Sequence, residues 1–459
     1  MTLFDVHDSR PVHFVGIAGA GMSALAELLA RRGIIVTGCD ANPNGAGDLE
    51  RLGIAVAPGH DPAHVTGAQA VVATSAMPRD HPELARAREL GIPVIRRAEA
   101  LAGAVEIGQT ICIAGTHGKT TTTVMTTEAL RAAGRNPTGV VGGRVASWSG
   151  NLSRGGEELF VVEADEYDRS FLALSPTVAT ITNVEADHLD IYADLDDIRG
   201  AFAQFASGAR AIVLCADDAG AASIALPSTA VIVRYGIESR DARLVARDLR
   251  SENGGITFNA VLDDSERAEI RLRVPGRHNV LNSLAALGSG HALGVPLAAM
   301  APGLAEFSGV ERRFQRLGEA RGIAVVDDYA HHPTEIRATL AAARAAFPGR
   351  RIIAAFQPHL YSRTRDFAGD FGGALAGADT IYLTEIYGAR EKPITGVTAA
   401  LIDGAARDAG RAVTWRGKRD ELAAALAAGA EPGDVVITLG AGDITRTGPE
   451  LLALLAGAR

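Results

Sequence analysis

Cys112-Ile-Ala-Gly-Thr-His-Gly-Lys-Thr-Thr-Thr-Thr123 is the stretch of sequence around which the rest of the chain is organised. The apolar run at 110–114 predicts a buried strand, and the residues after the two glycines predict a helix to about residue 133. A strand, a glycine turn, a lysine and a helix form a cradle for phosphate, because backbone N–H groups and the helix N-terminus face the anion.

Two side chains of this stretch extend the prediction from phosphate to a metal nucleotide. Lys119 supplies a point charge for terminal phosphates, and Thr120 supplies a hydroxyl for magnesium. The spacing departs from the usual phosphate loop, since Ile113 stands where the first glycine would be. The alternative is a glycine turn that binds nothing. Four consecutive threonines argue against it, because β-branched residues are mediocre helix formers and need another reason to be there.

Composition limits the class of protein. A chain of 459 residues predicts about three domains, and a net charge of −9 argues against nucleic-acid and anionic membrane partners. Three cysteines without a paired motif fit a reducing compartment. The start of the chain predicts no signal peptide, and no stretch reaches the roughly 20 apolar residues of a membrane span. The sequence therefore predicts a cytoplasmic protein.

The first domain predicts a nucleotide site of its own. Residues 13–29 are typical of a strand, a glycine-rich turn and a helix, and a second strand at 34–39 is followed by Asp40. Such a turn binds phosphate of any kind, so a UDP-type ligand, NAD and no ligand at all stay open. The strand–helix rhythm continues to about residue 105.

Polar residues follow two further buried strands of the central region. Glu163-Ala-Asp-Glu166 follows one strand, and the loop at 183–190, which contains His188, follows the strand at 178–182. Acids at the carboxyl ends of strands near a phosphate loop are typical of a magnesium site. A solvated acidic loop and a structural histidine are the alternatives. Because nitrogen is an unusual ligand for magnesium, manganese is a second candidate.

The remaining chain predicts more sheet and a third α/β unit. Residues 229–275 predict strands that flank the parallel sheet, and a long helix follows His278 and Asn279, with Asn279 either capping it or contacting a base. From residue 308, four predicted strands each end in polar residues: one before Asp327 and three at 352–356, 380–384 and 435–439. The predicted fold class is α/β in three domains: an N-terminal Rossmann-like domain (1–105), a central P-loop ATPase domain with a mixed sheet and helices (106–307), and a C-terminal Rossmann-like domain (308–459).

The motifs, taken in order, resemble a known family. The set that resembles the Mur ligases of peptidoglycan synthesis is Gly115 to Thr122, Glu163 to Glu166, Thr182-Asn183 with Asp187-His188, and His278-Asn279. The set that is similar to the members adding L-alanine to UDP-N-acetylmuramate is 16–23, 327–335 and 356–365. The resemblance runs from about residue 12 to about residue 445.

The resemblance implies a reaction: ATP phosphorylates the lactyl carboxylate of UDP-N-acetylmuramate, and the amino group of L-alanine attacks the acyl phosphate. The catalytic residues it implies are Lys119, Glu163, His188, His331, His359 and Arg363. The ATP-binding residues it implies are Gly115, Thr116, His117, Gly118, Lys119, Thr120, Thr121, His278, Asn279, Arg313 and Asp328. For the UDP-sugar they are Gly19, Ala20, Gly21, Met22, Ser23, Asp40 and Ser75, and for Mg²⁺ (or Mn²⁺) they are Thr120, Glu163 and His188.

Two departures from the family pattern change what we expect. Several related ligases carry a carbamylated lysine on magnesium, but this chain has no lysine between Lys119 and Lys392, so we expect no carbamate. Leu360 stands where some relatives have a second arginine, so one group that could hold the alanine carboxylate in those relatives is absent here. A monomer and a homodimer both stay open.

Other functions remain as alternatives. The ligase that recycles a tripeptide onto the same sugar nucleotide shares many of these motifs. A folylpolyglutamate synthase would leave the N-terminal glycine turn without a role. A dinucleotide-dependent oxidoreductase would leave Lys119, Glu163 and His188 unexplained, and a non-catalytic nucleotide switch would leave the polar strand ends of the third domain unexplained.

Overall fold

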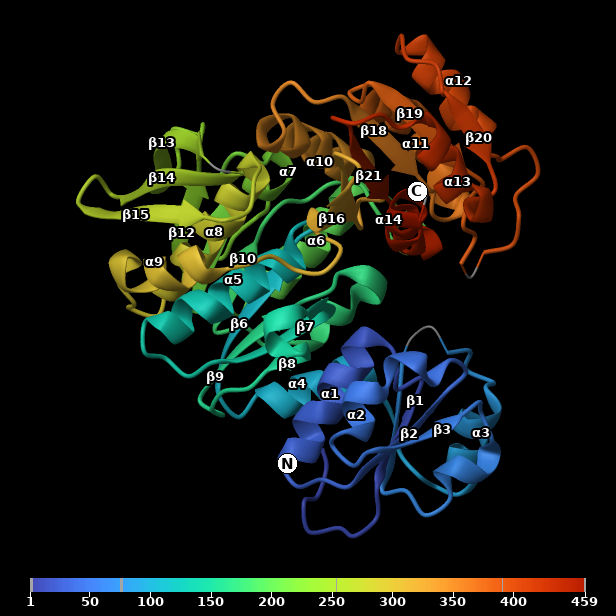
Figure 1. Cartoon of the computed structure of the whole chain (residues 1–459). Helices are drawn as coiled ribbons and strands as arrows, with labels where there is room; N and C mark the ends of the chain where they lie inside the picture. Colours follow the sequence, from blue (N-terminus) through green and yellow to red (C-terminus); the bar gives the residue numbers. More distant parts are fainter. Residues whose placement is uncertain (1–2, 75–76, 253, 390, 458–459) are drawn as a thin grey trace. The chain divides into compact units, whose positions relative to one another are not determined.

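The computed structural model describes residues 3–74, 77–252, 254–389 and 391–457, and it contains three β-sheets (Figure 1). The predicted fold class, α/β with three such regions, is confirmed. Among the helices that the structure describes, none is long and apolar enough to cross a membrane.

The N-terminal sheet has five parallel strands in the order β3-β2-β1-β4-β5, the order of a Rossmann-like unit. The strands are β1 (Val12–Val15), β2 (Val36–Asp40), β3 (Ala55–Pro58), β4 (Ala70–Ala73) and β5 (Val94–Arg96). The helices are α1 (Ala20–Arg31), α2 (Gly47–Glu50), α3 (Pro82–Glu89) and α4 (Arg97–Val105), with short 3₁₀ turns η1 (Pro43–Gly45) and η2 (Pro62–Val65).

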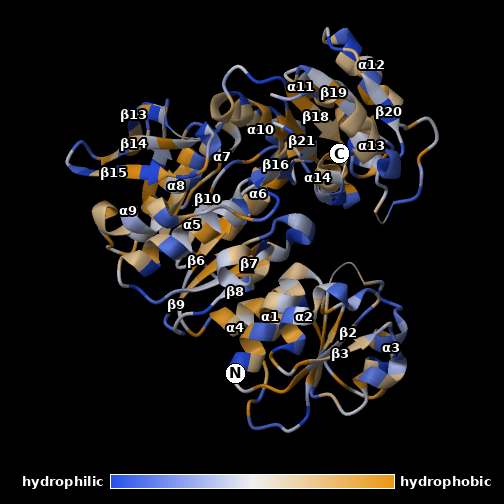
Figure 2. Cartoon of the chain, viewed as in Figure 1, coloured by the Kyte–Doolittle hydropathy of each residue, from blue (hydrophilic) through white to orange (hydrophobic). Residues whose placement is uncertain are grey.

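Alternation along the strands gives this sheet two buried faces. Val12 and Phe14 pack with α1 and α4 in one apolar cluster, whereas Val15 packs with α3 in another. Figure 2 shows the hydrophobic colouring concentrated on the strands of the sheets. His13 shares the second face with Val15, which becomes important below.

The central sheet has ten strands in the order β15-β14-β13-β12-β11-β10-β6-β9-β7-β8. The strands are β6 (Gln109–Ala114), β7 (Thr138–Val145), β8 (Gly150–Ser153), β9 (Leu159–Glu163), β10 (Val178–Ile181), β11 (Ala211–Cys215), β12 (Val231–Gly236), β13 (Leu244–Glu252), β14 (Gly255–Leu262) and β15 (Glu266–Leu272). The helices and turns are α5 (Lys119–Ala132), η3 (Ala146–Trp148), η4 (Tyr167–Ala173), α6 (Leu195–Ala206), α7 (Ala219–Ala222), α8 (Arg277–His291) and α9 (Leu297–Glu306). Strand β6 pairs in parallel with β9 and β10, so the loops after these three strands meet at one edge.

The threonines of α5 are buried. Packing therefore explains why this helix contains so many threonines, which helix propensity does not favour. Thr120 to Thr123, Thr126 and Thr127 are all inaccessible or nearly so. The hydroxyls of Thr123, Thr126 and Thr127 donate to the carbonyl oxygen four residues earlier, which satisfies them inside the buried helix. Helix α9 packs closely on α5: a Cβ on Gly303 would lie 2.3 Å from the carbonyl oxygen of Glu128. Small and short side chains therefore bury this helix against its neighbours.

The C-terminal sheet has six strands in the order β16-β17-β21-β18-β19-β20, parallel except for the antiparallel pair β16–β17. The strands are β16 (Gln315–Ala320), β17 (Ile323–Asp328), β18 (Ile352–Phe356), β19 (Thr380–Thr384), β20 (Trp415–Gly417) and β21 (Val435–Leu439). The helices are α10 (Pro333–Ala346), α11 (Tyr361–Leu375), α12 (Ala400–Asp408), α13 (Arg419–Gly429) and α14 (Thr447–Gly457), with the turn η5 (Asp443–Arg446). Helices α10, α11 and α12 cover one face, and α13 and α14 cover the other.

The chain forms two compact units. The first comprises 1–248, 258–270 and 281–307, and the second comprises 249–257, 271–280 and 308–459. The first unit therefore contains the whole N-terminal sheet and most of the central region. The domain limits at 105 and 307 stay predictions.

Candidate active site

The phosphate loop is fixed by two glycines that no other residue could replace without strain. Gly115 has φ +142° and lies so close to Thr182 that an added Cβ would be 2.0 Å from its hydroxyl oxygen. Gly118 has φ +80°, and an added Cβ would be 2.6 Å from Oδ1 of Asn282. The left-handed conformation and the close approach together explain why the turn after β6 needs glycine at both positions.

The loop between these glycines is held by the strand next to it. The side chain of Asn183, just after β10, accepts from the amide of His117 (2.7 Å) and donates to its carbonyl oxygen (3.0 Å). The hydroxyl of Thr116 accepts from the amide of Glu185 (2.9 Å). Asn183 was quoted in the sequence motif without a role, and the structure gives it one: it positions the loop.

The N-terminus of α5 fits an anion. No described side chain caps the helix, and its first turn contains no acid. The Lys119 ammonium lies beside it and donates to the carbonyl oxygen of Gly115 (2.8 Å) and to Oε2 of Glu166 (2.7 Å). Thr121 lies in the same first turn and is buried. Helix dipole, N–H groups and ammonium therefore place positive charge at one point.

Burial controls the charges here. Burial alone would lower the pKa of Lys119, but the carboxylates of Glu166 and Asp165 outweigh it and raise that pKa above its usual value. Burial raises the pKa of Glu166 to about 7, against the opposing charge of Lys119. Lys119 thus stays protonated at physiological pH.

Two of the three predicted metal ligands contact each other directly. The hydroxyl of Thr120 donates to Oε1 of Glu163 (3.0 Å), and the amide of Gly142 donates to Oε2 (2.7 Å). The third predicted ligand, His188, has φ +52°, and its Nε2 lies 3.8 Å from Oε1 of Glu166 and 3.8 Å from Oδ2 of Asp187. Hydroxyl and carboxylate oxygens are the donors magnesium prefers, so Thr120 and Glu163 fit the ion.

Five of the predicted UDP-sugar residues form the start of α1, and a sixth, Asp40, ends β2. Gly19 is the N-cap, Ala20 to Ser23 form the first turn with Met22 buried, and no described side chain caps this helix. A pocket of about 500 Å³ opens here, lined by Ala20 and Ser23 from α1, by the η1–α2 segment, and by Arg144 and Asn151. Asp40 accepts from the amides of Ala18 (3.0 Å) and Asn42 (2.9 Å), so its carboxylate shapes the turn. Ser75 lies outside the described residues.

In the second unit, His278 and Asn279 belong to the first turn of α8. Asn279 is inside the helix rather than at its N-cap, and its side-chain Nδ2 donates to the carbonyl oxygen of Pro275 (2.7 Å). Burial, with a smaller effect from the charge of Arg313, lowers the pKa of His278 to about 4, so its ring is neutral at physiological pH.

A carboxylate that was not predicted as a site residue connects two of the predicted ones in this unit. Glu335 lies 3.4 Å from Arg313 and 3.2 Å from Nδ1 of His331. The rings of His331 and His359 lie 6.0 Å apart. Glu335 therefore joins Arg313 and His331, and His359 lies beside His331. Arg363 is buried in the first turn of α11.

Asp328 lies at the end of β17 and is also buried. It accepts from the amides of Phe314 (2.8 Å) and Ala330 (2.7 Å). Burial raises its pKa to about 6, although Arg313 and these amides oppose the shift.

Glu166 and Glu335 are the functional candidates that sequence reasoning missed. Both stand inside quoted motifs, three residues after Glu163 and four after His331. The sequence signal was that each acid stands at the start of a helix or turn within a predicted site motif. Only the structure shows that Glu166 pairs with Lys119 and that Glu335 pairs with Arg313 and His331.

The phosphate loop, the acidic strand end and the three α/β regions now agree with comparisons to known proteins. The chain belongs to the Mur ligase family: the family's catalytic domain matches residues 11–107, its middle domain 113–290 and its glutamate ligase domain 312–442.

Particular relatives are similar over nearly their whole length. The UDP-N-acetylmuramate–L-alanine ligase of Rubrobacter xylanophilus is 47% identical, covering 97% of this chain and 100% of that protein. The enzyme of the same name from Acidothermus cellulolyticus is 46% identical, covering 96% and 94%. The crystal structure of the UDP-N-acetylmuramate-alanine ligase of Thermotoga maritima superposes with a TM-score of 0.83 at 30% identity, covering 98% and 100%.

Proposed function

We propose that this chain joins L-alanine to the lactyl carboxylate of UDP-N-acetylmuramate in an ATP-dependent reaction of peptidoglycan synthesis. The observation that carries the chemistry is the convergence of Lys119, the α5 N-terminus and the Thr120–Glu163 pair at the phosphate loop. The substrates come from the relatives, which match this chain over almost its entire length.

The phosphate loop would carry the first step. The substrate carboxylate attacks the γ-phosphorus of ATP, the bond to ADP breaks, and an acyl phosphate forms. This step needs neutralisation of charge more than proton transfer. Lys119 and the N–H groups of the loop supply it, since they are fixed before the reaction by Asn183, Thr182 and Glu166.

Thr120 and Glu163 would hold Mg²⁺, or Mn²⁺, with the nucleotide. The ion supplies positive charge to the phosphate oxygens. The amide of Gly142 orients the Glu163 carboxylate towards Thr120. His188 acts beside Glu166 in this proposal, as an orienting group for the acid that holds Lys119.

We propose no carbamate, because Lys119 is the only lysine of the central region.

The second unit would serve the nucleotide and the amino acid. His278, Asn279, Arg313 and Asp328 are the proposed ATP contacts, and His331, His359 and Arg363 the proposed contacts of the muramyl and alanine groups. The α-amine of L-alanine attacks the acyl carbon, phosphate leaves, and the amine loses a proton. The buried guanidinium of Arg363 suits a carboxylate, because its N–H groups match two oxygens at once.

The α1 turn and its pocket would bind the uridine diphosphate part. A pocket of about 500 Å³ with an uncapped helix N-terminus suits a diphosphate with a sugar. We further propose that the protein is cytoplasmic, since the UDP-sugar and ATP are cytoplasmic substrates. We propose that it acts as a monomer or a homodimer.

The test is phosphate release from ATP in the presence of magnesium and UDP-N-acetylmuramate, with either L-alanine or the L-Ala-D-Glu-diaminopimelate tripeptide added. We expect L-alanine to drive release. Release driven only by the tripeptide would replace the proposal with the recycling ligase and leave the ATP site intact. No release with either amine would contradict a ligase that uses this sugar nucleotide.

A further inference from the structure

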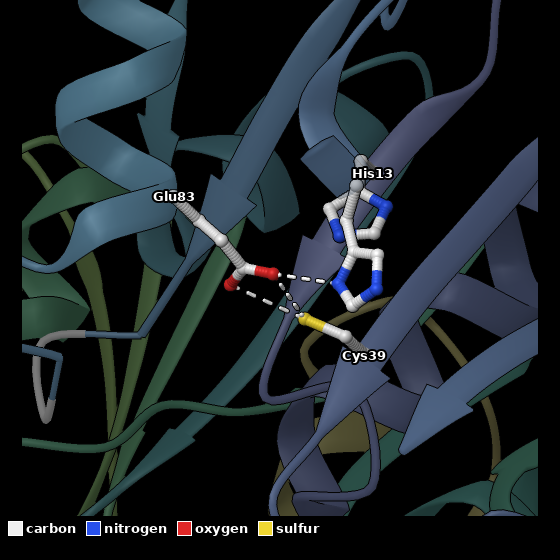
Figure 3. A group of neighbouring side chains, drawn as sticks. His13, Cys39 and Glu83 are labelled. Carbon is white, nitrogen blue, oxygen red and sulfur yellow. Dashed lines mark hydrogen bonds and ion pairs between the residues drawn. The ribbon is translucent and has the colours of Figure 1, made fainter. Parts of the chain in front are cut away.

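A group of metal-binding side chains lies on the face of the N-terminal sheet away from α1. His13 comes from β1, Cys39 from β2, His64 from η2 and Glu83 from α3, and Figure 3 labels His13, Cys39 and Glu83 as they point towards one another. One ligand atom of each residue lies within 4.8 Å of those of the other three. None of these residues belongs to the phosphate loop or to the pocket at α1.

The centre of the group is a fully buried carboxylate. Glu83 is 0% exposed and accepts from Sγ of Cys39 (3.1 Å) and from the amide of Asp61 (3.1 Å). Its nearest imidazole nitrogens are Nδ1 of His64 at 2.9 Å and Nδ1 of His60 at 3.1 Å. Among the described residues, every ion-pair partner of Glu83 is a histidine, so no permanent cation neutralises it. A buried carboxylate is costly without a positive partner, and a metal dication is one.

His13 provides an independent observation. It is 2% exposed, and Nε2 has no hydrogen-bond partner among the described residues. Nδ1 lies 3.0 Å from the hydroxyl of Thr37, directly across in the β1–β2 register. When Nδ1 donates its proton to Thr37, Nε2 keeps a free lone pair. This is how a second residue orients a histidine for a metal.

The donor set selects the metal. One thiolate, two imidazoles and one carboxylate are the donors of tetrahedral zinc sites, and the soft thiolate is a poor ligand for magnesium or calcium. A thiolate and a carboxylate also balance the two charges of the ion, so the buried centre would be neutral overall. Binding would release the thiol proton of Cys39 to solvent and form the S–Zn bond in its place.

We propose that His13, Cys39, His64 and Glu83 form a zinc site in the N-terminal domain, separate from the site of ATP chemistry. The site would tie strands β1 and β2 to η2 and α3. The carbonyl oxygen of Cys39 also accepts from the amides of Gly16 and Ile17, so the same residue anchors the glycine turn before α1.

A second arrangement of ligands competes with this one. His60, His81 and Glu83 also lie within 4.8 Å of one another. That group has no thiolate and is more exposed. A single change at Cys39 or His81 distinguishes the two.

The experiment uses the full chain, stripped with a chelator and titrated with zinc against a colorimetric competitor. We expect one tightly bound zinc per chain and at least tenfold weaker binding in Cys39→Ser and in His64→Gln. Cys215→Ser is the matched control, since Cys215 is equally buried but lies on β11 outside the group, and it should bind as the unaltered chain does.

Cobalt keeps the test decisive if Cys39→Ser does not fold. The unaltered chain loaded with Co²⁺ should show a thiolate-to-cobalt charge-transfer band and the visible bands of tetrahedral cobalt. Absence of the charge-transfer band would overturn the proposal. So would zinc binding that survives Cys39→Ser and is lost in His81→Ala, which would assign the ion to the competing group.

Discussion

Gly118→Ala tests whether the phosphate loop depends on the close approach of Asn282. A residue other than glycine at φ +80° costs about 1–2 kcal/mol of backbone strain. The added Cβ would also lie 2.6 Å from Oδ1 of Asn282, so that side chain must move and lose its hydrogen bond from Thr122 (3.2 Å). Disturbing a buried amide in this way costs about 1–3 kcal/mol more.

Gly134→Ala is the matched control, because it lies just beyond the other end of the same helix. Gly134 has φ +77°, and a Cβ there would meet nothing within 4 Å. Both variants therefore carry the backbone strain, and only Gly118→Ala carries the displacement of Asn282. If the displacement of Asn282 weakens transition-state binding at the phosphate loop by the same amount, about 1–3 kcal/mol, kcat/KM for ATP should be about 5- to 150-fold lower in Gly118→Ala than in Gly134→Ala.

The assay is phosphate release at varied ATP with saturating UDP-N-acetylmuramate and L-alanine, after a thermal scan confirms that each variant is folded. The clash disappears when Asn282 is shortened, so Gly118→Ala should cost less in an Asn282→Ala background than alone. Equal kcat/KM in Gly118→Ala and Gly134→Ala would refute the reasoning, and so would effects of Gly118→Ala and Asn282→Ala that simply add.

Three further predictions concern charges of the site. Lys119→Met should lower kcat/KM by at least about 100-fold, because a fixed phosphate contact is lost. The control is the same change at exposed Lys418, which should leave kcat/KM unchanged. Near-normal turnover in Lys119→Met would contradict the role of Lys119. Glu163→Gln should raise the magnesium concentration needed for half-maximal activity, with exposed Glu157→Gln as control, and an unchanged magnesium titration would remove Glu163 from the metal site. Asp328 has a pKa of about 6 in the folded chain, above its unfolded value, so it favours folding most below about pH 4 and this contribution is lost as the pH rises through about 6. In Asp328→Asn, the free energy of unfolding measured with urea should therefore fall less between about pH 4 and pH 6 than in the unaltered chain, by an amount on the order of 3 kcal/mol. Parallel curves of unfolding free energy against pH for the two proteins would show that the pKa of Asp328 is ordinary.

The strand, turn and helix of the phosphate loop could be predicted because their signals are local. Strand β6, the turn at Gly115 and Gly118, and helix α5 follow one another directly, so hydrophobic pattern, glycine and lysine all act within one short stretch. The strands β10, β18, β19 and β21 were found for the same reason: each is a short buried apolar run. Short or amphipathic edge strands such as β16 and β20 have no such pattern, and they were missed.

Pairings between distant side chains could not be predicted. The sequence placed Glu163 and Glu166 near Lys119, but their assignment depends on how η4 turns back: Glu166 contacts the lysine and Glu163 contacts Thr120. The same holds for His13, Cys39, His64 and Glu83, which come from four separate elements without a metal-binding spacing. Only the pairing of β1 with β2 and the packing of α3 bring them together.

The scarcity of lysine gives the buried ammonium of Lys119 a practical use. Only three lysines occur in the chain, and the side chain of Lys119 is 13% exposed and bound to Glu166. An amine-directed reagent therefore has one target in the central region, and its reaction depends on how firmly the loop encloses that target. Mass-spectrometric labelling of this single amine, with Lys392 and Lys418 as internal standards, would report nucleotide occupancy in the unaltered chain without an engineered probe.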